Sequence, residues 1–242
     1  YELSGNGWVQ IGQDIDGEAP SELSGDSVSL SANGRRIAIG AVGRGRVRVF
    51  DWSGNTWQQV GQTINGPGDH SGSCISLSAD GTRLAIGAPG MDVNGTNAGQ
   101  VVVYQLFGNT WNQLGQAING EGAQDFNGSS VSLSADGQRL AIGAPENDGR
   151  GTDAGQVRVF EILGDTWVQL GEDIRGNTTI TAGIWPIDQL GGSVSLNRDG
   201  TRLAVRSQHM SEVTNGFVVG IYEWSEGRWA QLGSDIRGIN GF

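Results

Sequence analysis

The chain alternates short apolar-polar stretches with glycine-rich turns, and this pattern predicts β-strands. Residues 128–145, GSSVSLSADGQRLAIGAP, hold two strand-like runs on either side of Asp136-Gly137. An Asp-Gly pair between alternating runs is typical of a hairpin with a type I′ turn or a close variant. Similar stretches begin at Gly25, Gly72 and, more weakly, Gly191. The sequence therefore repeats one hairpin four times.

A second hairpin follows each of these stretches. It begins with a β-branched or aromatic run such as VRVF at 157–160 and ends in a block of the form W-x-Q-(I/V/L)-G-x-x-I-x-G. Five tryptophans open this block, at spacings of 49, 54, 56 and 62 residues: Trp8, Trp57, Trp111, Trp167 and Trp229. The glycine inside each block indicates a bulge in the fourth strand. These glycines are Gly12, Gly61, Gly115, Gly171 and Gly233.

A period near 50 residues with four antiparallel strands predicts an all-β fold, a β-propeller. One such sheet cannot bury both of its faces, so successive sheets must stack around an axis. We expect four full blades plus a half blade, about five blades in all, in one domain over 1–242. The units are 1–24 (the half unit), 25–71, 72–127, 128–190 and 191–242. The repeated tryptophan is then a packing residue between blades.

The half unit leaves three alternatives open. The fifth blade is two-stranded, or the sequence is a piece of a longer array, or a neighbouring chain supplies the missing strands. An uncovered strand edge is a template for pairing with another chain. A homo-oligomer formed through an exposed strand edge is therefore one hypothesis for this protein.

Composition excludes several classes of partner. The formal charge is −11, whereas nucleic acids and anionic membrane surfaces require a basic footprint. No run approaches the roughly 18 to 20 apolar residues that cross a bilayer, so we expect no membrane insertion. The single cysteine, Cys74, lies in a strand-like run and is expected to be a small buried hydrophobe.

The repeat resembles the FG-GAP repeat, the blade unit of integrin-α-type propellers. The matching elements are Gly-Ala-Pro at 87–89 and 143–145, and Phe126-Asn127-Gly128, which is close to the Phe-Gly element. The resemblance implies an extracellular or cell-surface binding domain with a protein or glycan ligand. Family members bind calcium in an Asp-rich loop between the first two strands, but here that loop is shortened to SADG or SANG. The family's calcium site is therefore not carried over.

Two other loops are rich in oxygen ligands and are weak calcium candidates. MDVNGTNAGQ contains Asp92, Asn94 and Asn97, and ENDGRGTDAGQ contains Asn147, Asp148 and Asp153. Calcium requires six to eight oxygen ligands. Ordinary solvated turns have the same composition, so the sequence leaves both interpretations open, with Asp92, Asn94, Asp148 and Asp153 as the candidate ligands.

The long connections of an up-and-down blade gather at one end, where variable loops on a rigid scaffold favour a binding face. Trp185 in the insertion GNTTITAGIWPIDQLGG is a candidate contact residue there, together with Asp92, Asn94, Asn97, Asp148 and Asp153. Three N-x-(S/T) glycosylation candidates lie at the same end: Asn94, Asn127 and Asn177. A recurring acidic residue before each unit is expected to anchor the inter-blade loop through backbone N–H groups. The acidic residues are Glu22, Asp69, Asp125 and Asp188.

Catalytic signatures are scarce in this sequence. His70 and His209 lie in different units, without the spacing of a zinc site or a catalytic triad. The sequence therefore favours a protein that is not an enzyme, has no cofactor, and acts as an extracellular binding or adhesion module. The alternative is a structural, self-assembling repeat protein. A lectin-like or hydrolytic propeller is the third hypothesis.

Overall fold

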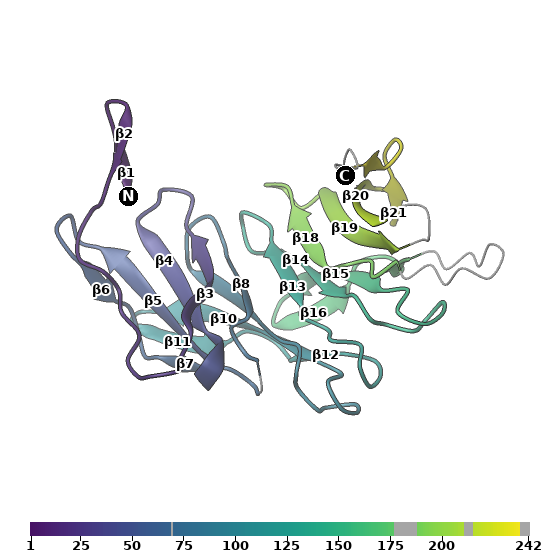
Figure 1. Cartoon of the computed structure of the whole chain (residues 1–242), viewed down its shortest axis with the longest axis horizontal. Coiled ribbons are helices and arrows are strands. Elements are labelled where there is room, and N and C mark those ends of the chain that lie inside the picture. The colour runs from purple at the N-terminus through teal and green to yellow at the C-terminus, as the bar shows by residue number, and fades with distance from the viewer. Residues whose placement is uncertain (69, 177–187, 211–214, 238–242) are drawn as a thin grey trace.

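The computed structural model describes residues 1–68, 70–176, 188–210 and 215–237 of the chain. It is an all-β protein, and the only helical turn in these ranges is the 3₁₀ segment Val42–Arg44. Four sheets each contain a four-stranded antiparallel meander and a short fifth strand that pairs with the third. A separate two-stranded sheet precedes them (Figure 1). The predicted propeller fold, with four blades and a half blade, is confirmed.

The strands follow the repeat units. The half blade is β1 (Glu2–Ser4) and β2 (Gly7–Val9). Blade 1 is β3 (Ser24–Leu30), β4 (Arg36–Ala41), β5 (Arg46–Trp52), β6 (Trp57–Gln59) and β7 (Ile64–Asn65). Blade 2 is β8 (Cys74–Leu77), β9 (Arg83–Ala88), β10 (Gln100–Phe107), β11 (Thr110–Gln113) and β12 (Ile118–Asn119). Blade 3 is β13 (Ser130–Leu133), β14 (Arg139–Ala144), β15 (Gln156–Leu163), β16 (Thr166–Gln169) and β17 (Ile174–Arg175). Blade 4 is β18 (Ser193–Leu196), β19 (Arg202–Met210), β20 (Asn215–Ser225), β21 (Arg228–Gln231) and β22 (Ile236–Arg237).

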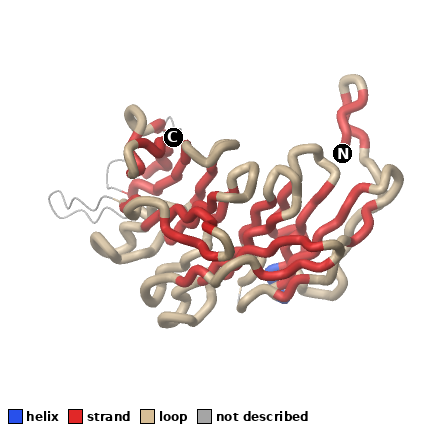
Figure 2. Tube along the Cα trace, turned by 180° about the vertical axis from the view of Figure 1, so that it is seen from behind, coloured by secondary structure: helices blue, strands red, loops and turns tan. Residues whose placement is uncertain are grey.

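The blades succeed one another in an open arc. Figures 1 and 2 show the β1–β2 hairpin projecting at one end of the arc and blade 4 at the other. Adjacent blades contact each other through their first strands, β3, β8, β13 and β18. The hydrophobic core lies between successive sheets, since each core cluster combines residues of two neighbouring blades. Pairing of an edge strand with a second chain stays a prediction.

The hairpin turns are a variant of the predicted type. The N–H of Gly81 donates to the carbonyl of Ser78, and Gly81 has φ +70°, whereas Asp80 is not among the residues with positive φ. This is a type I turn closed by a left-handed glycine, not a type I′ turn, which needs two positive φ angles. The Asp80 carboxylate accepts hydrogen bonds from Ser78 and Thr82, which makes it a turn residue as expected.

The predicted fourth-strand bulge is present and is larger than a single residue. In blade 3, Gln169 pairs with Phe160, but Ile174 pairs with Val157, so the outer strand contains two extra residues. The bulge splits the fourth strand into β16 and β17. Gly171 in the bulge has φ +80°, a conformation that glycine adopts without steric cost.

Serine hydroxyls link the first strands of adjacent blades. The N–H of Leu77 donates to Ser29 Oγ at 2.9 Å, and the N–H of Leu133 donates to Ser76 Oγ at 3.0 Å. Cys74 occupies a serine position in this series, and its Sγ lies 3.2 Å from the N atom of Val131. Burial raises the pKa of the Cys74 thiol, which disfavours the nucleophilic thiolate. The Ser-x-Ser pattern therefore encodes contact between blades.

Paired glycines allow the second strand of one blade to approach the residue that precedes the first strand of the next blade. A side chain at Gly87 would collide with the carbonyl oxygen of Gly128, the residue that begins the next unit. The pairs Gly40–Gly72 and Gly143–Gly191 have the same relation. The glycine of Gly-Ala-Pro is thus required by the interface between blades.

The repeated tryptophan joins the outer parts of neighbouring blades, as predicted. Trp167 is 3% exposed, and its Nε1 donates to the carbonyl of Leu114 at 3.0 Å. The Gln116 amide from blade 2 donates to the Trp167 carbonyl and accepts from its N–H. Gln62 binds Trp111 in the same way. Trp8, in the β1–β2 hairpin, is 69% exposed.

The connections separate into two ends. The N–H of Leu106, at the turn from third to fourth strand, donates to Thr82 in the turn from first to second strand. At the opposite end, the N–H of Gln124, between blades, donates to Thr96 in the long β9–β10 loop. The predicted sorting of short turns and long loops is confirmed. Within the described ranges, no helix has the length and apolar character that would let it span a bilayer.

Truncating a buried repeat tryptophan should destabilise the fold, while truncating its exposed counterpart should not. We expect Trp167→Ala to lower the free energy of unfolding by about 3–5 kcal/mol, because it empties an interface between blades. Trp8→Ala should change it by less than about 0.5 kcal/mol. Urea denaturation followed by circular dichroism measures both, and equal losses would contradict the packing role.

Asp80 should make part of the stability dependent on pH. Burial raises its pKa, but the hydrogen bonds from Ser78 and Thr82 and the charge of Arg83 outweigh burial and hold the pKa below its ordinary value. A depressed folded pKa gives stability that is present above the unfolded pKa and is lost as the pH falls through the folded value. Asp80→Asn introduces the residue that blade 1 has at this position, Asn33, so the variant should fold. Its melting temperature should fall less than that of the parent when the pH is lowered from 5 to 3. An unchanged acid sensitivity in thermal melts would contradict this role of Asp80.

Candidate functional site: a polar cleft on blade 3

A polar cleft of about 520 Å³ opens where the loop between blades 2 and 3 meets the outer part of blade 3. Its lining residues are Glu121, Arg150, Gln169, Gly171, Glu172, Asp173 and Arg175. They come from three places: the β12–β13 connection, the β14–β15 loop, and the bulged segment from β16 to β17. The cleft thus contains three carboxylates and two guanidinium groups.

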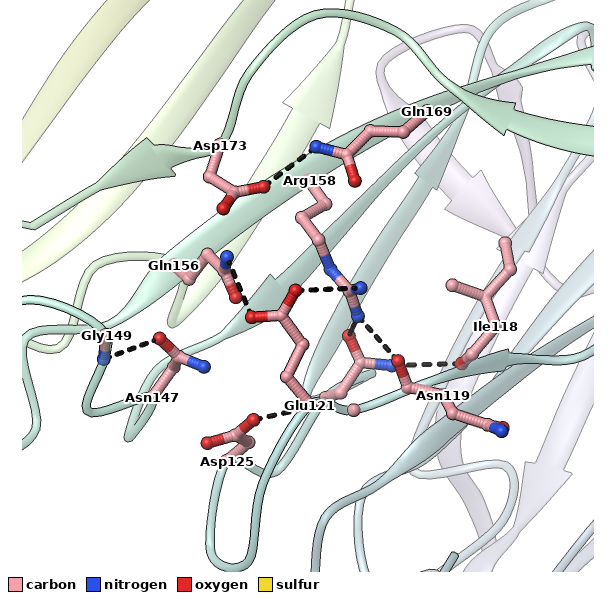
Figure 3. A network of polar contacts seen from close by, with 12 residues as sticks. Ile118, Asn119, Glu121, Asp125, Asn147, Gly149, Gln156, Arg158, Gln169 and Asp173 are labelled. Carbon is pink, nitrogen blue, oxygen red and sulfur yellow. Dashed lines mark hydrogen bonds and ion pairs between the residues drawn. The ribbon is translucent and has the colours of Figure 1, made fainter. Parts of the chain in front are cut away.

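Arg158 on β15 points towards Glu121 of the cleft and is 8% exposed (Figure 3). Its Nη2 donates to the carbonyl of Asn119 at 2.7 Å and to Asn127 Oδ1 at 2.9 Å. Its Nη1 lies 3.6 Å from Glu121 Oε1, and its guanidinium stacks on Phe160. Burial lowers the pKa of Arg158, and the Glu121 carboxylate partly offsets this effect. Arg158 therefore ties blade 3 to the loop that leaves blade 2.

Glu121 is held from two sides while half of its side chain stays exposed. Besides Arg158, the Gln156 amide donates to Glu121 Oε2 at 3.4 Å. Asp125 Oδ2 accepts the backbone N–H groups of Glu121 and Gly122, which fixes the loop itself (Figure 3). Glu22 binds the N–H groups of 18 and 19 in the same way. The predicted anchoring role of the recurring acidic residue is confirmed at these two positions.

Asp173 and Arg175 form the opposite side of the cleft. Arg175 Nη2 lies 2.6 Å from Asp173 Oδ2, and Gln169 Nε2 donates to Asp173 Oδ1 at 2.8 Å. Burial raises the pKa of Asp173, but the hydrogen bonds from Arg175, Gln169 and Gln156 hold it below its ordinary value. Arg175 also reaches the carbonyl of Gly149, which links the bulge to the β14–β15 loop. The rim of the cleft is thus a connected polar network.

The cleft lies where the sequence departs from its own repeat. The residue after the bulge glycine is a glutamine in the first three blocks, Gln13, Gln62 and Gln116, and each binds the next tryptophan. In the fourth block this residue is Glu172. A carboxylate cannot donate to the carbonyl of Trp229 as those amides do. Glu172 instead lines the cleft.

In the two oxygen-rich loops, the side chains predicted as calcium ligands form hydrogen bonds within the protein. Asp92 Oδ1 accepts the N–H of Asn97 at 2.8 Å, and Asp148 Oδ1 accepts the N–H of Asp153 at 2.9 Å. Asn94 Nδ2 donates to the carbonyl of Gly120. Both loops therefore show the hydrogen bonding of ordinary turns. In the described ranges, no group of three or more His, Cys, Asp or Glu side chains is placed to hold a metal ion. Calcium binding at these loops stays a hypothesis.

The other predicted contact residues fall elsewhere. Trp185 and Asn177 lie outside the described residues. Asn94 is exposed, whereas Asn127 is fully buried and its amide bonds both Arg158 and the carbonyl of Ile118. The prediction of a glycosylation site at Asn127 is therefore wrong. A buried side-chain amide with two hydrogen bonds inside the protein cannot carry a glycan in this fold.

A second cleft, of about 590 Å³, lies between the β4–β5 and β7–β8 connections of blade 1. It is lined mainly by glycines, with Arg44 and His70 as its ionisable side chains. The N–H groups of Gly45, Gly66 and Gly68 are already bound within the protein. It offers a ligand fewer positioned side chains than the cleft on blade 3.

Comparison with known proteins gives a fold but no family. No family model and no curated protein matches the sequence. Hydrazine synthase from Kuenenia stuttgartiensis is a similar structure, with a TM-score of 0.55 and 18% identity over 85% of this chain and 53% of its own. A candidate 6-phosphogluconolactonase from Bacteroides uniformis gives a TM-score of 0.56 and 16% identity over 87% of this chain and 54% of its own. The β-propeller domain of Cps50 (Swd1) from Myceliophteria thermophila gives 0.50 and 12% over 82% and 53%. The chain spans about half the length of these structures.

The expected function needs a correction. The sequence favoured a non-catalytic extracellular adhesion module, but the similar solved propellers include hydrazine synthase and a candidate lactonase. A propeller of this shape therefore does not indicate a non-catalytic protein. At such identities the likeness establishes the fold alone, and none of these structures is named an FG-GAP repeat protein. The resemblance to that family stays a prediction, and function must be argued from the cleft.

Removing the buried guanidinium should weaken the contact between blades 2 and 3. We expect Arg158→Val to lower the free energy of unfolding by about 1–3 kcal/mol, because the Asn119 carbonyl and the Asn127 amide oxygen lose their donor. Val102 occupies the corresponding position of blade 2, so valine fits the strand. Arg35→Val, at an exposed turn, is the control and should cost less than about 0.5 kcal/mol. Equal stability of both variants in urea denaturation would contradict the role of Arg158.

Proposed function

We propose that the cleft on blade 3 is the substrate site of an enzymatic propeller, and that the reaction is hydrolysis of an ester or lactone of a hydroxylated small molecule. The observation that carries this proposal is Glu121, a half-exposed carboxylate fixed at the cleft by Arg158 and Gln156. Active sites usually combine a concave opening with a few polar groups in fixed positions. The cleft meets this description better than the turns predicted from the sequence.

The side chains suit general-base hydrolysis. Glu121 would accept a proton from a water molecule as the water oxygen attacks the carbonyl carbon of the ester. Negative charge would develop on the carbonyl oxygen, where N–H groups of Arg150 or Arg175 would stabilise it. When the tetrahedral intermediate collapses, the ester C–O bond breaks and the proton passes from Glu121 to the leaving alkoxide. The products are a carboxylic acid and an alcohol, which are joined in one molecule when the substrate is a lactone.

The geometry also supports binding of a hydroxylated ligand. Carboxylates accept hydrogen bonds from ligand hydroxyls and guanidinium groups donate to them, and the cleft supplies both along its rim. The name of the Bacteroides uniformis structure supports a lactone as the substrate class. A hydrolytic propeller, the third hypothesis from the sequence, is therefore the function that we propose.

Glu121→Gln should remove the activity and leave the fold intact. We expect residues 1–242 to accelerate hydrolysis of a δ-lactone such as gluconolactone in a pH-stat, above the spontaneous rate. Glu121→Gln should reduce the accelerated rate by about 10²-fold or more, the usual contribution of a general base.

Glu18→Gln is the matched control. Glu18 follows the same repeat glycine and lies 3.7 Å from Arg48, the counterpart of Arg158, but it does not line the cleft. It should keep the full rate. A parent protein that does not accelerate lactone or ester hydrolysis, or a Glu121→Gln variant as active as the parent, would overturn the proposed function.

A further inference from the structure

The charges of the cleft bear on which hydroxylated molecules can enter it. Three carboxylates and two guanidinium groups line the opening. Asp173 lies 2.6 Å from Arg175, and the buried Arg158 lies 3.6 Å from Glu121. Arg175, in the lining, and Arg158, which does not line the cleft, therefore already have carboxylate partners. A phosphate group carries up to two negative charges and would compete with those partners.

Carboxylates face Arg175 from two of the three segments that build the cleft, the β12–β13 connection and the bulged segment, whereas the β14–β15 loop contributes Arg150. The Asp173 hydrogen bond raises the pKa of Arg175, and the charges of Asp173, Glu121 and Glu172 raise it further. The whole chain has a formal charge of −11, so the long-range field also opposes an anion. Phosphate sites in proteins instead use surplus cationic groups or several unbound backbone N–H groups.

Glu172 adds a carboxylate at the one place where the repeat has an amide. It is exposed, and its position is occupied by Gln13, Gln62 and Gln116 in the first three blocks and by Ser234 in the fifth. Its charge is therefore a feature of this cleft and not of the propeller scaffold. An ammonium group near Glu172 would gain a charge-assisted hydrogen bond.

We infer that the cleft selects neutral or amine-bearing sugar derivatives and discriminates against phosphorylated ones, with Glu172 as the residue that determines the preference for an amine. This inference rests on the proposed function, because it names the substrate class of the same site. It separates this chain from an enzyme for a phosphorylated lactone such as the one named for the Bacteroides uniformis structure.

Three probes of one ring test the selectivity: glucose, glucosamine and glucose 6-phosphate, titrated calorimetrically into residues 1–242 at low salt. We expect glucosamine to bind at least about fivefold more tightly than glucose, and glucose 6-phosphate at least about tenfold more weakly. The advantage of glucosamine should shrink at 0.5 M salt, because screening weakens exposed ion pairs.

Glu172→Gln restores the amide of the first three blocks, and it should bring the ratio of glucosamine to glucose affinity down to about one. Glu18→Gln, outside the cleft, should keep the parent's ratio. Tightest binding of glucose 6-phosphate, or a Glu172→Gln variant that keeps the amine preference, overturns this inference and leaves the proposed function standing. Failure of all three probes to bind, together with no lactone hydrolysis, overturns the proposed function itself.

Discussion

The close approach of first strands from neighbouring blades is the contact on which the whole molecule depends. One four-stranded sheet of this length leaves both faces open, and its apolar side chains become buried only against the next sheet. The approach is helped by the glycines of Gly-Ala-Pro, which lie in the second strand of one blade against the glycine that opens the following unit. Serine hydroxyls then accept the N–H groups that point across the gap. Backbone contact and hydrogen bonding at the first strands thus add to the apolar side-chain packing between the sheets.

This interface also explains where a site can form. Near the axis the blades are in backbone contact, and the repeat positions there are glycine, serine and alanine. Towards the outside the sheets diverge, and the gap is closed by a tryptophan and by long polar side chains. The same location holds Val102 between blades 1 and 2 but Arg158 between blades 2 and 3. Where Arg158 takes the position of Val102, the loop that leaves the preceding blade has Glu121 at the position of Pro67. The two substitutions therefore occur together and form an ion pair. The same pair occurs as Arg48 and Glu18 in blade 1, so the cleft on blade 3 arises where this exchange is combined with Glu172 and Asp173 of the bulged segment.

The repeat made the fold predictable from the sequence, but it did not indicate where the cleft lies. Five tryptophan blocks and four copies of one hairpin fix the strand order, the outer bulge and the role of Trp167, all of which the structure contains. The turn at Asp80 differs in detail because a type I turn with Gly81 needs only one left-handed residue. The candidate residues at Asp92 and Asp148 were chosen by composition, but their carboxylates close their own loops. Composition cannot distinguish an oxygen that is free for a ligand from one that is already bound by its own backbone.

The signal for the cleft was present in the sequence as a departure from the internal pattern. Glu172 breaks a run of three glutamines whose amides each donate and accept at the next tryptophan, and an ionised carboxylate can only accept. This pair of hydrogen bonds between glutamine and tryptophan stabilises each interface where it occurs. Where the glutamine is lost, we expect other contacts to compensate or the new residue to have another role. Trp229 of blade 4 still donates to the Leu170 carbonyl of blade 3, and Arg175, paired with Asp173, links the bulge to the β14–β15 loop. The interface therefore tolerates the loss of the amide, and the charge of Glu172 is left facing the cleft.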